Sequence, residues 1–282
     1  MGFFDRLGKG WKMGMASLKV IRANKQLVLF PIISGIAMLL VIASFLGLVY
    51  INYGTDVDNM MENSSAIDYV VSFLYYLVGY FVIVFFNVGL VHCTRIHLQG
   101  GKPSFGDGVR FAIKRIPIIL GWAVLSATVG IILKAIEENS GTVGSIISSI
   151  VGVVWSIVTF FVVPILAYEE VGPITALKRS GQIMKEKWGE SIGASFSFGI
   201  LTLVGILIIA LPVGILFSFI HPIVGISLGV LMIFLIQSIV SSAEMVFIAS
   251  VYHQVVEEAP VDDFDSELID DLFVKKQKKG LF

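Results

Sequence analysis

Three polar residues on one apolar segment are the main candidates for a functional site in this sequence. Gln237, Ser241 and Glu244 follow one another at the spacing i, i+4, i+7, which places them on one face of a helix. An ionisable group in such a segment is costly and often marks a path for ions or substrates. Asn87, in a second apolar segment, could join them. We expect this face to point into a helical bundle, either as an intramembrane polar site or as a set of interhelical hydrogen bonds.

Sequence patterns of known catalytic chemistry are absent. The metalloprotease, serine hydrolase and phosphate-loop patterns do not occur, and the single cysteine cannot form an intrachain disulfide. His92 and His97 are five residues apart and do not share a helical face. An enzyme that acts on lipid headgroups through these histidines and Glu170 is the least favoured reading. We therefore expect no catalysis, no metal and no cofactor.

The composition is that of a membrane protein. Of 282 residues 56% are hydrophobic and 15% are charged, whereas soluble domains carry about one quarter charged residues. A helix needs about 20 apolar residues to cross a bilayer, and far fewer suffice for a barrel strand. We expect an all-α, polytopic helical bundle. Its six transmembrane helices are predicted at about 27–51, 69–91, 116–133, 143–168, 192–219 and 222–251.

The distribution of positive charge predicts the orientation. Lysine and arginine gather before the first run, after the second, after the fourth and in the C-terminal tail. Of the 20 Lys and Arg residues, only Lys134 lies elsewhere. The positive-inside rule then places both termini of a multi-pass cell-membrane protein in the cytoplasm. Because the charges are segregated and the net charge is −1, nothing indicates a nucleic-acid partner.

Residues 1–26 are predicted to form an amphipathic helix that lies in the membrane interface. We expect Trp11, Lys12 and Lys19 to contact lipid. The membrane domain then spans 27–252, and an acidic and then basic cytoplasmic tail follows at 253–282. The apolar stripe of the first helix consists of Phe4, Leu7, Trp11, Met15, Leu18 and Ile21.

A second interfacial helix is predicted to begin at Gly172 and Pro173, since proline fits the first helical position. Lys178, Arg179 and Trp188 are its expected lipid contacts. Its apolar face would hold Ile174, Leu177, Gly181, Met184 and Trp188.

The acids Glu169 and Glu170 stand before this helix, where its dipole favours negative charge. A structural role therefore suffices for both. A third, shorter copy starts at the predicted cap Ser104. Its shared face would hold Phe105, Val109, Ala112 and Ile116.

The stretch PILAYEEVGPITALKRSGQIMKEKW, residues 164–188, resembles the membrane domain attached to some glycerophosphoryl diester phosphodiesterases, and related uncharacterised six-helix membrane proteins. The matching residues are Pro164, Glu169 or Glu170, Ala176 to Ser180, and Trp188. The sequence has no counterpart of the catalytic phosphodiesterase domain. The resemblance thus implies a membrane module without catalytic residues.

The function that these patterns favour is a non-enzymatic membrane scaffold or lipid-interacting module. Its partners would be anionic headgroups of the cytoplasmic leaflet, together with any protein that docks at the same face. The alternative is a transporter or channel whose path includes Glu244. Pro212 is expected to kink the fifth span, because it removes one helical hydrogen bond.

Overall fold

The computed structural model describes residues 3–54, 66–139, 141–187 and 193–257, and every regular element within these ranges is helical. The chain forms two compact units. Unit 1 comprises Met1–Ile32, Leu90–Gly108 and Gln182–Phe282, and unit 2 comprises Ile33–Gly89 and Val109–Gly181.

Within the described ranges, six helical segments are long and apolar enough to cross a membrane. Each overlaps one predicted span, so the prediction of an all-α polytopic bundle is confirmed. Helices satisfy their own backbone hydrogen bonds, which is the condition for crossing hydrocarbon. The segments are Lys25–Ile51, Tyr69–Leu98, Ile116–Glu138, Gly141–Tyr168, Phe198–Ser218 and Pro222–Gln254.

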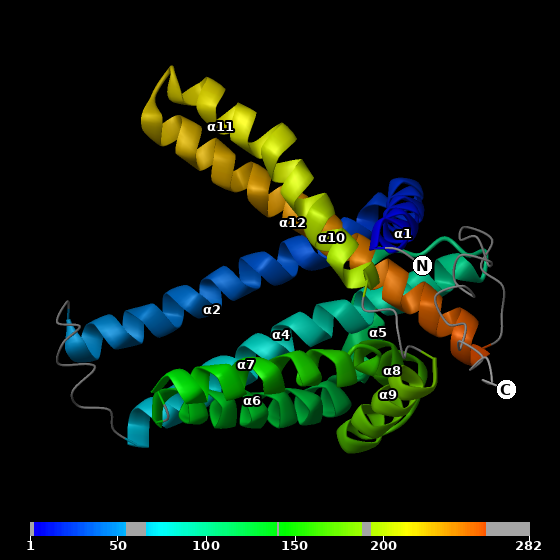
Figure 1. Cartoon of the computed structure of the whole chain (residues 1–282), viewed down its shortest axis with the longest axis horizontal. Coiled ribbons are helices and arrows are strands. Elements are labelled where there is room, and N and C mark those ends of the chain that lie inside the picture. The colour runs from blue at the N-terminus through cyan, green and yellow to red at the C-terminus, as the bar shows by residue number, and fades with distance from the viewer. Residues whose placement is uncertain (1–2, 55–65, 140, 188–192, 258–282) are drawn as a thin grey trace, which may run out of the picture. The chain divides into compact units, whose positions relative to one another are not determined.

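Unit 1 is built around α12 (Pro222–Glu257). Helix α1 (Phe3–Ala23) packs against α12 and against α10 (Gly193–Gly205), and α11 (Leu211–Ser218) runs beside the first half of α12 (Figure 1). The short η1 helix (Lys25–Val28) connects α1 to the first span. Fully buried side chains that form this core include Met13, Val20, Leu27, Phe30, Phe247 and Tyr252.

The fifth span is irregular at the place where Pro212 was expected to disturb it. A π-helix, η2 (Ile206–Ala210), separates α10 from α11, and Pro212 lies in the first turn of α11. Because proline has no N–H, the regular bond to the carbonyl four residues earlier cannot form, and a wider turn takes its place. The interruption therefore takes the form of a π-helix.

Unit 2 holds α6 (Ile116–Asn139), α7 (Gly141–Val158) and α8 (Val162–Tyr168). It also holds most of α2 (Leu29–Tyr53), α4 (Ala66–Leu98) and α9 (Pro173–Lys187), and the end of α5 (Phe105–Lys114). Helix α6 packs on α7 (Figure 1). The rings of Trp122 and Trp155 stack between the two helices with centroids 5.9 Å apart. The fourth span was expected to be one continuous helix. Instead it breaks at residues 159–161, between α7 and α8.

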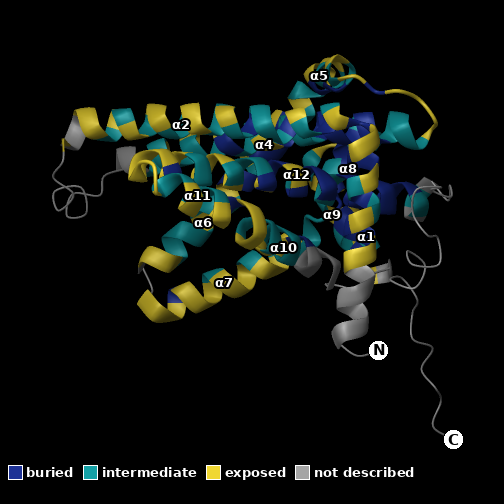
Figure 2. Ribbon diagram, turned by 90° about the horizontal axis from the view of Figure 1, so that it is seen from above, coloured by how far each residue is buried: buried dark blue, intermediate teal, exposed yellow. Residues whose placement is uncertain are grey.

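Large apolar side chains stay exposed along α2, α7 and α11 (Figure 2). Soluble proteins rarely leave such long apolar surfaces in water. In a bilayer the same surfaces meet acyl chains, so the exposure fits the membrane assignment. Examples are Leu40, Ile51, Ile150, Ile215 and Leu216.

Candidate functional site

Helix α9 begins at Pro173, as predicted, and it packs on protein through a face that shares only Met184 with the predicted lipid-facing set. Ala176, Ser180 and Met184, at four-residue spacing, are the buried residues. Ile174 was expected at the apolar face and is 62% exposed. The face predicted to meet lipid is therefore open at Ile174, and the helix docks on protein through an adjacent face, where the small side chains of Ala176 and Ser180 allow close approach.

Ser180 connects α9 to the break in the fourth span. The backbone N–H of Phe161 donates to the hydroxyl of Ser180 over 3.0 Å, and both residues are fully buried. Since α8 begins only at Val162, this N–H lies outside the regular helical bonding, and a side-chain oxygen accepts it instead. On the same helix, a methyl group at Gly181 would lie 3.3 Å from the Val158 side chain. Helix α9 is thus fixed to the bundle of unit 2.

The two acids before α9 form ion pairs. Glu169 accepts a hydrogen bond from Arg179 over 2.5 Å, and Glu170 lies 3.5 Å from Arg115. These contacts support the structural role expected of both acids. Arg179, expected to contact lipid, is engaged with Glu169, whereas Lys178 is exposed. Trp188 lies outside the described residues.

Helix α1 carries two apolar faces. One face, with Met13, Ser17 and Val20, is buried where α1 packs on α10 and α12. The second leaves Trp11 41% and Met15 49% exposed. Lys12 and Lys19 are exposed as well, and Leu18 is half-buried.

The single stripe predicted for α1 is therefore corrected at Ile21, which is buried in the protein. A helix with two adjacent apolar faces can bury one and leave the other outward. The side chains of Phe4 and Leu7 lie outside the described ones.

A polar junction joins η1, α4 and α5 within unit 1. The Asn24 side-chain amide donates to the Val20 carbonyl over 3.1 Å and lies 3.1 Å from Nδ1 of His97. The Gln26 amide donates to the Pro103 carbonyl over 2.7 Å. These bonds satisfy polar groups at the helix ends, which is a structural task.

The predicted cap at Ser104 is confirmed. The backbone N–H of Asp107 donates to the Ser104 hydroxyl, and the backbone N–H of Ser104 donates to the Asp107 carboxylate. This reciprocal pair is a capping box with aspartate in the third helical position.

The histidines and the acid of the least favoured enzyme reading fall in different units of the chain. His92 and His97 belong to unit 1, His97 lies against Asn24, and Glu170 belongs to unit 2. Among the residues that the structure describes, no group of three or more His, Cys, Asp or Glu could hold a metal ion.

On α12, the polar residues in the interior differ from those predicted. Gln237 is exposed, so the expectation that its face points into the bundle fails there. Ser238 and Ser242 are buried instead, and their hydroxyls donate to the carbonyls of Phe234 and Ser238 over 2.8 and 2.9 Å. A serine can be buried because its hydroxyl bonds to a carbonyl of its own helix, whereas the longer amide of glutamine needs partners on a neighbouring segment. The i, i+4 spacing of Ser238 and Ser242 was the feature of the sequence that could have indicated this buried face.

Glu244 and Ser241 on α12 are half-buried. Among the described residues, Glu244 makes no hydrogen bond or ion pair. Asn87 is also half-buried, but it belongs to unit 2. In the predicted polar set, Glu244 is therefore the ionisable residue that is half-buried without a partner among the described residues.

The six apolar helices and the short helices docked on them define a polytopic helical membrane protein. A model of a family of unknown function, DUF6159, matches residues 66–260, and the chain belongs to this family. Comparisons with curated proteins and with solved structures give no match. The likeness of residues 164–188 to the phosphodiesterase membrane domain stays a prediction.

Proposed function

We propose that this protein is a non-enzymatic, lipid-interacting membrane module whose helix α1 contacts anionic headgroups at the cytoplasmic surface. One observation carries the proposal: α1 is held by α10 and α12 along one face, while Trp11 and Met15 stay exposed on another. Both termini would lie in the cytoplasm, as the distribution of lysine and arginine predicts.

The exposed part of α1 suits a membrane interface. Trp11 and Met15 are four residues apart and share a face, and the exposed Lys12 and Lys19 flank it on one side. Tryptophan favours the headgroup level, and each lysine near an anionic leaflet adds about 1 kcal/mol of attraction. Because the helix is already packed on the protein, lipid contact requires little further ordering.

We expect the fluorescence of Trp11 to be quenched by lipids that carry bromine on their acyl chains. The experiment uses the full chain with Trp122, Trp155 and Trp188 replaced by phenylalanine, in nanodiscs of phosphatidylglycerol and phosphatidylcholine. A matched chain that keeps only Trp122, which is buried, serves as the control and should be quenched far less. Equal quenching of the two chains would refute the proposed lipid contact of α1.

The headgroup preference has its own test in the same sample. Replacing Lys12 and Lys19 by glutamine should lower the quenching of Trp11 in bilayers with phosphatidylglycerol and leave it unchanged in pure phosphatidylcholine, because screened charge attraction acts only on the former. An identical effect in both lipids would contradict the preference for anionic headgroups.

A second candidate function, transport or conduction along α12, is favoured by the position of Glu244. None of the described residues pairs with this carboxyl group. An unpaired carboxyl group inside an apolar segment destabilises a fold, and such groups are kept where they act on ions or substrates. We expect Glu244→Leu to raise stability by about 1–3 kcal/mol, because it removes that cost.

Cys93 allows this effect to be measured without a known substrate. It is the only cysteine and is buried, so a thiol-reactive dye reports its exposure on heating. The Glu244→Gln variant, which keeps the shape and a hydrogen-bonding group, should fall between wild type and Glu244→Leu. A lower melting temperature for Glu244→Leu would show that the carboxyl group serves packing, which would argue against the transport reading.

A further inference from the structure

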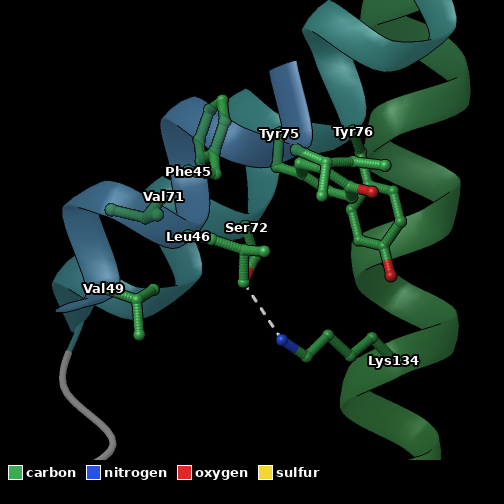
Figure 3. A pocket seen from close by; sticks show the side chains of 9 residues that line it. Phe45, Leu46, Val49, Val71, Ser72, Tyr75, Tyr76 and Lys134 are labelled. Carbon is green, nitrogen blue, oxygen red and sulfur yellow. Dashed lines mark hydrogen bonds between the residues drawn. The ribbon is translucent and has the colours of Figure 1, made fainter. Parts of the chain in front are cut away.

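A pocket of about 310 Å³ opens between α2, α4 and α6 of unit 2 (Figure 3). Its wall on α2 is apolar and includes Ile42, Phe45 and Leu46. The Tyr75 ring meets Phe45 edge-on, with centroids 5.4 Å apart. Lys134, from α6, closes the other side.

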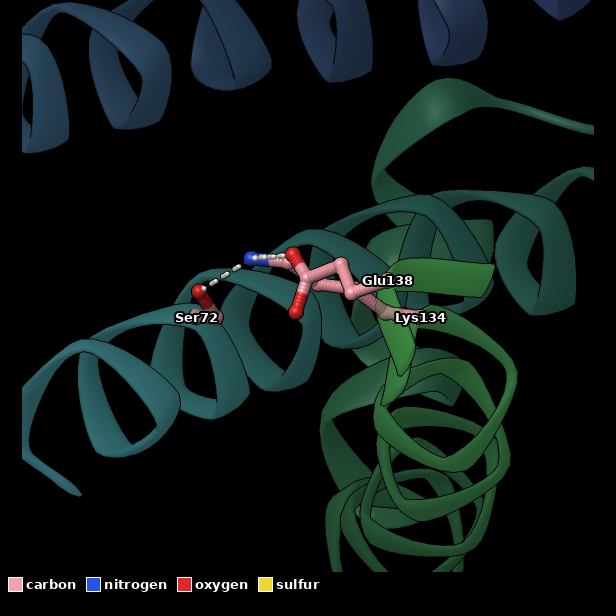
Figure 4. Close-up of polar contacts among 3 residues, drawn as sticks. All are labelled: Ser72, Lys134 and Glu138. Atoms are coloured by element: carbon pink, nitrogen blue, oxygen red, sulfur yellow. Dashed lines mark hydrogen bonds and ion pairs between the residues drawn. The ribbon is translucent and has the colours of Figure 1, made fainter. Parts of the chain in front are cut away.

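An ion pair lies at the polar end of this pocket. The ammonium group of Lys134 donates to the hydroxyl of Ser72 over 3.0 Å and lies 3.7 Å from a carboxylate oxygen of Glu138 (Figure 4). The side chains of Lys134 and Glu138 are 36% and 47% exposed. An exposed ion pair of this kind contributes only about 0–1 kcal/mol to stability. A ligand can therefore bind between Lys134 and Glu138 without a large loss of stability.

The position of the pocket along the spans fits a lipid. Lys134 lies four residues before the end of the third span at Glu138, which is about 6 Å of helix, close to headgroup depth. On α2, the residues that line the pocket extend from Ile42 to Val49, which is about 10 Å of helix. The apolar surface of α2 beside this wall is exposed. Lys134 is also the one cation outside the predicted cytoplasmic segments, so this end is expected on the opposite side of the membrane.

We propose that this pocket binds one zwitterionic phospholipid with a primary amine, of the phosphatidylethanolamine class. The lipid phosphate accepts hydrogen bonds from Lys134 and Ser72, and the headgroup ammonium donates to Glu138. The upper part of one acyl chain lies on Phe45 and Leu46. A volume of 310 Å³ suits this part of the molecule, and the rest of the lipid stays in the bilayer.

The charges select among headgroups. Glu138 and the neighbouring exposed Glu137 outnumber Lys134, so a headgroup with net negative charge is repelled. A choline headgroup has no N–H to donate to Glu138, whereas an ethanolamine headgroup does. The site is separate in residues and in unit from the contacts proposed for α1, so either proposal can fail without the other.

Native mass spectrometry of the delipidated full chain, titrated with phosphatidylethanolamine, tests the site. We expect one saturable adduct, and about tenfold weaker binding for Lys134→Gln, because a charge-assisted hydrogen bond is lost. Lys114→Gln, which changes an exposed lysine at the end of α5, is the matched control and should bind as wild type does. Equal binding by Lys134→Gln and wild type would overturn the proposal.

Two further variants keep the test decisive. Leu46→Trp fills the pocket from an exposed position and should remove the adduct even if Lys134→Gln folds poorly. Glu138→Gln should reduce the preference for phosphatidylethanolamine over phosphatidylcholine to near one. A phosphatidylglycerol adduct that is as tight as the phosphatidylethanolamine adduct and is lost in Leu46→Trp would overturn the assignment to a zwitterionic lipid, because phosphatidylglycerol held at α1 does not depend on Leu46. A phosphatidylethanolamine adduct that survives Leu46→Trp would overturn the proposal as well.

Discussion

The Gly225→Ala variant is expected to lose about 3 kcal/mol of stability, because the added methyl group would overlap the backbone of the neighbouring helix. A Cβ at position 225 would lie 2.5 Å from the carbonyl oxygen of Gly214 and 2.5 Å from the backbone nitrogen of Ser218. It would also lie 2.0 Å from the Ser218 hydroxyl. A side chain can rotate away, but the backbone of α11 cannot, so α11 and α12 must separate where they meet (Figure 1).

The measurement is the melting temperature of the purified full chain, followed by circular dichroism and by reaction of a thiol dye with Cys93. Gly199→Ala is the matched control, since this exposed helical glycine has no neighbour within 4 Å of an added methyl group. Alanine should be neutral there or stabilise by up to about 1 kcal/mol, because it favours the helix more than glycine does. If the two variants melted at the same temperature, the close approach of α11 and α12 would be refuted.

The Ser180→Ala variant is expected to lose about 2 kcal/mol, because it removes the hydroxyl that accepts a hydrogen bond from the buried N–H of Phe161. A local consequence should accompany this loss. The amide of Phe161 should exchange with deuterium faster than in wild type, since the bond that ties the break in the fourth span to α9 is missing.

A matched serine separates this effect from simple loss of a hydroxyl. Ser149, on α7, is exposed and donates only to the Ser145 carbonyl of its own helix. Ser149→Ala should therefore change stability by less than about 0.5 kcal/mol and leave the exchange of Phe161 unchanged. Unaltered exchange of Phe161 in Ser180→Ala would show that α9 is not anchored in this way.

The hydrogen bond between Phe161 and Ser180 explains part of the ALKRS stretch at residues 176–180. Ala176 and Ser180 face the protein, whereas Lys178 is exposed and Arg179 bonds to Glu169. The pattern in the sequence combines a docking face of small side chains with a basic outer face. The sequence alone presented it as a helix that lies on lipid.

The sequence by itself determined the elements whose causes are local. Six apolar runs of spanning length must be helices, because hydrocarbon offers no other partner for the backbone. The start of α9 at Pro173 and the cap at Ser104 also depend on groups within one turn. These predictions needed no knowledge of any neighbouring helix.

Only the tertiary structure decided which face of each helix meets protein and which meets lipid. Both surroundings are apolar, so the hydrophobic pattern that orients a helix in a soluble protein does not distinguish them. Gln237 is exposed while Ser238 is buried, and α9 turns Ile174 outward while Ala176 packs inside. Close approach of small residues sets these choices, and it depends on the partner helix.

The pocket at Lys134 was likewise beyond the reach of the sequence. Its parts come from residues 42–49, 71–76 and 134, on three helices that are far apart along the chain. Lys134 is the one lysine or arginine away from the predicted cytoplasmic side, but its partners could not be read from the sequence. Packing of α2, α4 and α6 places its ammonium group beside Ser72 and an apolar wall, because long-range contacts rather than local spacing bring these side chains together.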